Sequence, residues 1–208
     1  MKKVLLFLLL LVVGIVGFYW YRFSHASGGF SGPKQQAIVL KKHSPAFNKS
    51  VGNLMTAYFE MKNAFVEADS IGARTNCQSF IRLLDSLPVN ELKKDSAIIL
   101  ATVSANINDI RMNAASLVKQ NNLTEMRKDF SMISEIMYPS FFRSINYEGD
   151  KMYWQNCPMA FGEGKEANWI SNSEEIVNPY LGKHHPEFKA TMLHCGETKD
   201  TIKPLLLP

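Results

Sequence analysis

From residue 48 onward, apolar residues recur every three or four positions, which is the spacing of one face of an α-helix. Four separate stretches show this spacing. Their apolar positions are Val51, Leu54, Met55, Tyr58, Met61 and Phe65; then Ala73, Cys77, Phe80, Ile81, Leu84 and Leu87; then Ile99, Val103, Ile107, Ile110, Ala114 and Leu117; and finally Met126, Phe130, Ile133, Met137 and Phe141. The pattern predicts a mainly α fold, a four-helix up-down bundle with one shared core.

Residues that cap or break helices stand near the predicted helix ends. They are Asn48 or Ser50 at the start of the first helix, Asp69 and Pro88 around the second, Asp95 and Ser96 before the third, and Thr124 before the fourth. Pro139 is expected to kink the fourth helix near its end. The connections between these ends are short, which favours antiparallel neighbours.

The helical spacing stops at about residue 146, where glycine, proline, asparagine and tryptophan become frequent. Residues 147–200 are therefore predicted to form an irregular, loop-rich C-terminal tail packed on one end of the bundle. Within the tail, residues 152–155 can form one short strand. Residues 48–200 are expected to make up a single domain.

An apolar segment precedes this domain. Lys2 and Lys3 lead into an unbroken apolar run from Val4 to Tyr21, about 18 residues long, which is the short end of what spans a bilayer. The run ends in aromatic residues that suit a membrane interface, and the lysines favour a cytoplasmic N-terminus. Residues 1–23 are thus expected to be a transmembrane helix, or alternatively a signal peptide cleaved near Ala26.

Either alternative places the domain outside the cytoplasm, in the periplasm. If residues 1–23 are a transmembrane helix, this single pass also holds the domain at the inner membrane. Residues 24–47 contain Gly28, Gly29 and the pair Gly32-Pro33 and have no sustained period, so they are expected to form a flexible linker. The membrane is the first predicted partner.

Charge and motifs exclude several functions. The formal net charge is +4, part of it beside the apolar start, and no basic stripe with interleaved aromatics is present, so nucleic-acid binding is not expected. The sequence also lacks a phosphate-binding glycine loop, a nucleophile elbow, a metalloprotease helix and a haem-attachment motif. The chain is therefore predicted not to be an enzyme.

Soft ligand atoms gather in the tail. Cys157 and Met159 flank a proline, and Met192, His194 and Cys195 lie within four residues of one another. Thiolates and thioethers select Cu(I), and a set with fewer sulfurs also suits Zn(II). The residues alone therefore indicate a possible metal site, with Cu(I) preferred over Zn(II).

Two other interpretations of these cysteines stay open. Cysteines in two loops of an exported domain usually form a disulfide, so Cys157 and Cys195 can instead be a structural staple, or they can remain free thiols. Cys77 lies on the apolar stripe of the second predicted helix. It is expected to be a small buried core residue rather than a ligand.

Four motifs follow one another in the tail. They are Cys157-Pro158-Met159-Ala160-Phe161, Asn168-Trp169-Ile170-Ser171, Glu175-Ile176-Val177-Asn178-Pro179-Tyr180-Leu181-Gly182 and Met192-Leu193-His194-Cys195-Gly196. Their order resembles a domain-of-unknown-function family of Bacteroidetes cell-envelope proteins, a family that also occurs fused to the periplasmic adaptor subunits of heavy-metal efflux pumps. The resemblance covers about residues 49–199.

This resemblance implies a helical periplasmic domain connected with metal efflux or homeostasis. It implies that Cys157, Met159, Met192 and Cys195 are metal donors, with His194 as a further candidate. A segment at residues 184–189 lengthens the family's pattern and adds two histidines, and an apolar anchor takes the place of the adaptor. The hypothesis is a membrane-anchored periplasmic binding protein for a soft metal ion such as Cu(I), partnered by an efflux pump or another envelope protein. The alternative is a non-catalytic envelope interaction module with a Cys157 to Cys195 disulfide.

Overall fold

The computed structural model describes residues 14–18 and 42–204, which belong to two separate compact units, Met1–Ala37 and Ile38–Pro208. In the first unit, residues 14–18 are helical. The rest of the predicted anchor and residues 24–41 of the predicted linker lie outside the described residues. Among the residues that are described, none of the helices combines the length and the hydrophobicity that a membrane span requires.

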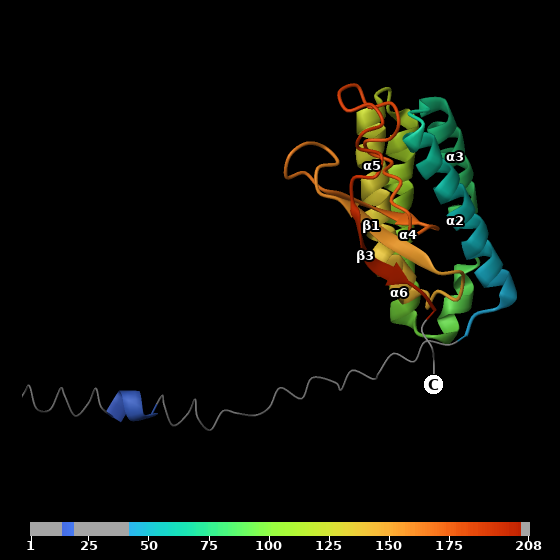
Figure 1. Ribbon diagram of the computed structural model, residues 1–208. Helices are drawn as coiled ribbons and strands as arrows, with labels where there is room; N and C mark the ends of the chain where they lie inside the picture. Colours follow the sequence, from blue (N-terminus) through green and yellow to red (C-terminus); the bar gives the residue numbers. More distant parts are fainter. Residues whose placement is uncertain (1–13, 19–41, 205–208) are drawn as a thin grey trace, which may run out of the picture. The chain divides into compact units, whose positions relative to one another are not determined.

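Four long helices form the body of the second unit, in agreement with the predicted helical content (Figure 1). They are α2 (Pro45–Val66), α3 (Ser70–Asp85), α4 (Ala97–Lys119) and α5 (Leu123–Glu135). Three short segments complete them: η1 (Val89–Lys94), η2 (Ile136–Phe141) and α6 (Phe142–Ser144). All of the apolar positions in the four predicted stripes are buried, except that Ile81 is half-buried.

Two predicted helix starts are wrong by a few residues. Helix α2 begins at Pro45, because the Ser44 hydroxyl accepts the Phe47 N–H at 3.1 Å and proline at the first helical position loses no hydrogen bond. Asn122, not Thr124, caps α5 by accepting the first backbone N–H groups. The described domain therefore starts before residue 48.

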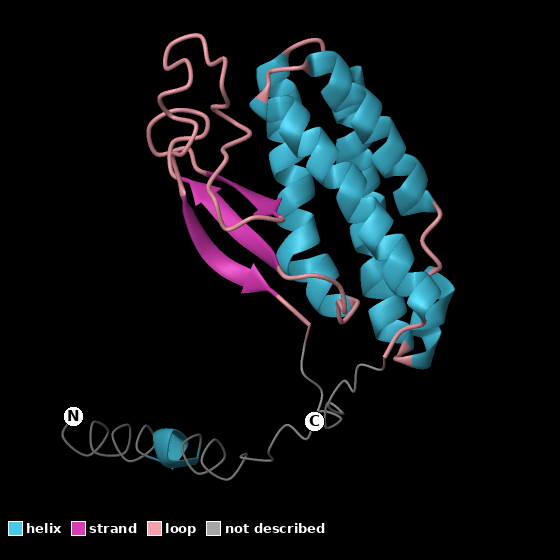
Figure 2. Cartoon of the chain, turned by 45° about the vertical axis from the view of Figure 1, so that its right-hand side comes forward, coloured by secondary structure: helices cyan, strands magenta, loops and turns pink. Residues whose placement is uncertain are grey.

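The tail is not irregular throughout, which corrects the predicted fold class. It contains an antiparallel three-stranded sheet in the order β2-β1-β3, made of β1 (Met152–Cys157), β2 (Ala167–Ser171) and β3 (Glu197–Ile202). The sheet lies along one side of the bundle, where β2 contacts α5 (Figures 1 and 2). Strand β3 is mostly polar and exposed, so it forms through pairing with the buried β1 rather than through an apolar pattern of its own.

A buried polar contact joins the sheet to the helices. The Tyr58 hydroxyl lies 2.6 Å from the Ser134 hydroxyl and accepts the Ile170 N–H at 3.1 Å, so one phenol connects α2, α5 and β2. The ring of Phe130 stacks on Tyr58 at 5.1 Å. Burial of such a phenol is tolerated because its oxygen is fully hydrogen-bonded.

The segment between β2 and β3 is held against the end of α2. Arg127 donates from Nε to the Pro179 carbonyl at 2.9 Å and from Nη2 to the Phe65 carbonyl at 2.8 Å. Gly182 has a φ of +59°, and a Cβ added there would lie 2.6 Å from the Val66 carbonyl oxygen. Glycine is needed at this position both for the left-handed conformation and for the close approach.

Replacing Gly182 by Ala is therefore expected to lower the free energy of unfolding by about 3 kcal/mol, since backbone strain and a steric clash add. Gly164 is the matched control, because its φ is +69° but nothing lies within 4 Å of an added Cβ. Gly164→Ala should cost only about 1 kcal/mol. Urea unfolding followed by circular dichroism measures the free energy of unfolding of both variants. Equal losses of free energy in the two variants would show that the close approach to Val66 is not the reason for glycine at position 182.

Candidate functional site

The pairing of β1 with β3 brings two cysteines together. Cys157 is the last residue of β1, and Cys195 lies two residues before β3 begins. Their Sγ atoms are 3.2 Å apart, and no disulfide links them. Cys157 is fully buried and Cys195 is half-buried. The structure thus places a pair of adjacent, partly shielded thiols at one end of the sheet.

Turns and one amide hold Cys195 in place. The Cys195 N–H donates to the Met192 carbonyl at 3.0 Å, and the side-chain amide of Asn178 donates to the Cys195 carbonyl at 2.8 Å. At Gly196, φ is +143° and an added Cβ would lie 2.4 Å from the Asn156 carbonyl oxygen. Gly196 thus allows the loop to approach the end of β1.

The surroundings of Cys195 favour the protonated form of its thiol. Burial, and then the contact with Cys157, raise the pKa of the Cys195 thiol to about 11. A thiol with so high a pKa is a poor nucleophile at neutral pH. Cys195 is therefore not the acidic thiol typical of disulfide exchange enzymes, and it must lose its proton to bind a metal ion.

Cys77 lies apart from this pair, in the helical core. It is fully buried, and its thiol donates to the Ala114 carbonyl at 3.4 Å. Burial raises the pKa of the Cys77 thiol to about 12. The prediction that Cys77 is a core residue is confirmed.

The two predicted thioether donors are close to the thiols along the chain. Met159 follows Cys157 by two residues in the turn after β1, and Met192 precedes Cys195 by three residues. Both methionines are partly buried and pack against the core. Met159 also lines a cavity beside the start of α5.

His194 is exposed, and its ring is oriented by one hydrogen bond. Its Nδ1 lies 2.7 Å from the Ile176 carbonyl oxygen. A carbonyl only accepts, so Nδ1 carries the proton and Nε2 keeps a free lone pair. This is the orientation that metal-binding histidines commonly show. Within residues 42–204, however, no three His, Cys, Asp or Glu side chains converge on one point, so His194 does not join the two cysteines in a preformed set.

The two histidines of the lengthened segment have other contacts. The Nδ1 of His185 accepts the N–H groups of Glu187 and Phe188, each at 3.2 Å, so its proton is on Nε2. The ring of His185 also stacks on Phe188 at 4.9 Å. His184 Nε2 lies 3.9 Å from a carboxylate oxygen of Glu67. His185 is therefore a turn-forming residue, with no ring nitrogen free to bind a metal ion.

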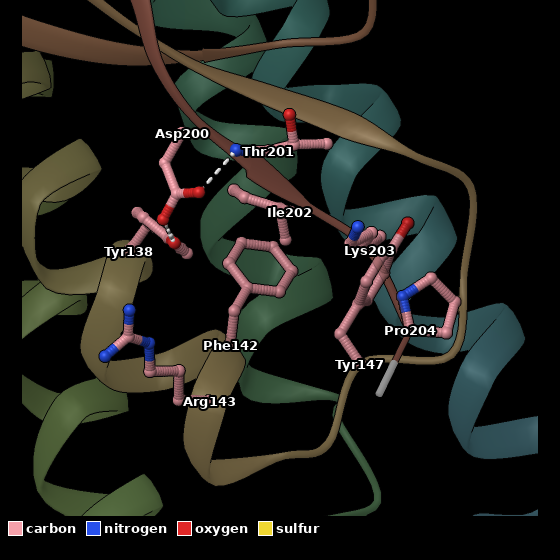
Figure 3. A pocket seen from close by; sticks show the side chains of 9 residues that line it. All are labelled: Tyr138, Phe142, Arg143, Tyr147, Asp200, Thr201, Ile202, Lys203 and Pro204. Carbon is pink, nitrogen blue, oxygen red and sulfur yellow. Dashed lines mark hydrogen bonds between the residues drawn. The ribbon is translucent and has the colours of Figure 1, made fainter. Parts of the chain in front are cut away.

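A separate cavity of about 400 Å³ lies between the end of β3 and the segment formed by η2 and α6 (Figure 3). The Tyr138 hydroxyl donates to Asp200, and the Arg143 guanidinium lies 5.8 Å from the centre of the Tyr138 ring. The hydrogen bond from Tyr138 lowers the pKa of the Asp200 carboxyl. The rings of Phe142 and Tyr147 form an apolar part of the cavity wall. Sequence reasoning missed this cavity, because pairing of β3 with β1 brings together residues that are far apart in the chain.

The fold and the site together define a helical domain with a small antiparallel sheet that carries paired thiols. Residues 54–145 match the family model described as "Protein of unknown function (DUF3347)". This match supports, for the helical part of the domain, the expectation of a domain-of-unknown-function family. It covers less than half of the chain and ends before β1, so the thiol-bearing tail lies outside it. No curated protein and no solved structure matches the chain.

Proposed function

We propose that this protein binds a soft metal ion, Cu(I), through the thiolates of Cys157 and Cys195. The observation that carries the proposal is the 3.2 Å separation of two unlinked sulfurs, one of them fully buried, at a fixed end of the sheet. Soft thiolate donors select Cu(I) among the biological metals. The chemistry is reversible coordination, in which no bond of a substrate is made or broken.

The number of donors favours Cu(I) over Zn(II). Structural zinc sites are almost always four-coordinate, and the described residues offer no third His, Cys, Asp or Glu beside the two thiols. Cu(I) also accepts thioether sulfur, which Met159 and Met192 carry within a few residues of the thiols. His194 could supply Nε2 after a movement of its loop, since its tautomer already leaves that nitrogen free.

The wider role that we propose is in metal efflux or homeostasis at the cell envelope. It is supported by the resemblance of the tail motifs to domains fused to efflux adaptors, and by the apolar N-terminal segment that suits an anchor. In this role the protein holds Cu(I) on the periplasmic side of the inner membrane and passes it to a pump or another envelope protein.

The test is a titration of the reduced protein with Cu(I) under anaerobic conditions, against a competing chelator. We expect one Cu(I) per chain, and an affinity at least about 100-fold lower in the Cys157→Ser, Cys195→Ser double variant. Cys77→Ala is the matched control, because it removes the third thiol from a site in the core and should leave the affinity unchanged. Binding that survives the double variant would contradict the proposal.

The second candidate function is an envelope interaction module in which the same two cysteines form a disulfide. The 3.2 Å separation also favours this candidate, since the sulfurs need to approach by only about 1 Å to reach bonding distance. Intact-mass measurement of protein isolated without reductant tests it. A quantitative loss of two hydrogens, together with a reduced form that does not compete for Cu(I), would replace the metal proposal with this one.

A further inference from the structure

A second cavity, of about 740 Å³, opens beside the start of α5. This volume lies within the range of small-molecule sites in proteins. Its walls are mainly apolar and include aromatic rings. They are formed by Leu123, Met159, Phe161, Tyr180, Leu181 and Phe188. Its apolar surface comes from α5, the turn after β1, the loop at residues 180–181 and the segment at residues 184–189.

A buried cation stands in the wall of this cavity. Arg127 is only 5% exposed, and among the described residues no carboxylate pairs with it. Nε and Nη2 each donate to a backbone carbonyl, whereas Nη1 has no hydrogen-bond partner there. Burial lowers the pKa of Arg127 to about 10, yet the group stays charged at neutral pH. An uncompensated guanidinium with free N–H groups binds a carboxylate well.

The exposed charged side chains that line this cavity are negative, opposite in sign to Arg127. Glu163 and Glu187 also line the cavity, and both are exposed. The ring of His185 adds no positive charge, since burial and then the nearby Arg127 lower its pKa. The cavity thus has a buried positive group and two exposed negative groups, separated by an apolar wall.

We propose that this cavity binds a small zwitterion with an apolar side chain, such as a free amino acid or a dipeptide. The ligand's carboxylate bonds to the free N–H groups of Arg127, and its ammonium group lies near Glu163 and Glu187. An anion without an ammonium group meets the two glutamates, and a cation without a carboxylate leaves Arg127 unpaired. The charge arrangement therefore selects molecules that carry both groups.

The test uses the dipeptide L-leucyl-L-phenylalanine as the probe and isothermal titration calorimetry of the purified protein as the measurement. We expect the C-terminal amide of this dipeptide to bind at least about tenfold more weakly, because it removes the charge that Arg127 recognises. We expect the N-acetyl dipeptide to bind about threefold to tenfold more weakly, because it loses attraction to the glutamates.

A variant separates the role of the glutamates from general effects on the protein. Glu163→Gln with Glu187→Gln should weaken binding of the dipeptide but not of its N-acetyl form, and neither exposed side chain is needed for folding. Glu174→Gln, an exposed carboxylate that does not line the cavity, is the control and should change nothing.

Three results would each overturn the proposal. The first is the absence of binding heat with the dipeptide up to about 10 mM, because the affinity would then be weaker than that of a built site. The second is equal affinity for the dipeptide and its amide. The third is an equal effect of the Glu163/Glu187 and Glu174 substitutions on dipeptide binding. Because the ligand series probes Arg127 without mutating it, the outcome does not depend on whether an Arg127 variant folds.

Discussion

Replacing Arg127 by Met is expected to lower the free energy of unfolding by about 4 kcal/mol. The side chain is buried, and methionine fills much of the same volume, so the loss comes mainly from hydrogen bonds. The buried Pro179 carbonyl would be left without its donor. The Phe65 carbonyl would lose the Arg127 bond and keep the Ala68 N–H at 3.2 Å. An unsatisfied buried carbonyl costs about 1–3 kcal/mol. Urea unfolding, followed by circular dichroism and tryptophan fluorescence, measures the change.

Arg74 provides a control with the same chemistry at a less buried site. It donates from Nε to the Val118 carbonyl at 2.9 Å and from Nη2 to the Gln120 carbonyl at 2.7 Å, and it is only half-buried. Water can replace these bonds, so Arg74→Met should cost about 1 kcal/mol. Equal losses of unfolding free energy in the Arg74 and Arg127 variants would show that burial of the carbonyls does not determine the size of the loss.

The importance of Arg127 could not be predicted from the sequence, although the helix that contains it could. Helical spacing repeats locally, so the stripe with Met126 and Phe130 identifies the apolar face of α5. Arg127 stands between these residues in the sequence and looks like an ordinary surface position. It is buried because Phe65 and Pro179, 62 and 52 residues away in the chain, converge on it. No local pattern records such a contact.

The same limit explains what was missed in the tail. Cys157 and Cys195 could be selected because thiols and thioethers are rare and cluster there, but their contact depends on the pairing of β1 with β3 across 38 residues. Strand β3 is polar and exposed, so its sequence has no strand pattern, and the tail was predicted to be irregular. Tyr138 and Asp200, 62 residues apart, meet through the same pairing.

The proposed Cu(I) affinity should rise steeply with pH, by at least about tenfold per pH unit between pH 6 and 8. Thiolate binds the ion and thiol does not, so each proton expelled on binding contributes a factor of about ten per unit. Cys195 contributes one such proton throughout this range, because its pKa is about 11 and its thiol is protonated in the metal-free protein.

The direction of this pH dependence follows from which form of the protein, metal-free or Cu(I)-bound, holds more protons. The metal-free protein carries the Cys195 thiol proton and the Cu(I) form does not, so lowering the pH favours the metal-free protein and weakens binding. Competition titrations at pH 6, 7 and 8, with a chelator whose own pH dependence is known, give the slope. The double serine variant should show no slope of this kind. An affinity that varies less than about tenfold per pH unit would mean that Cys195 does not bind as a thiolate, and the metal would then have to be held by donors other than this pair.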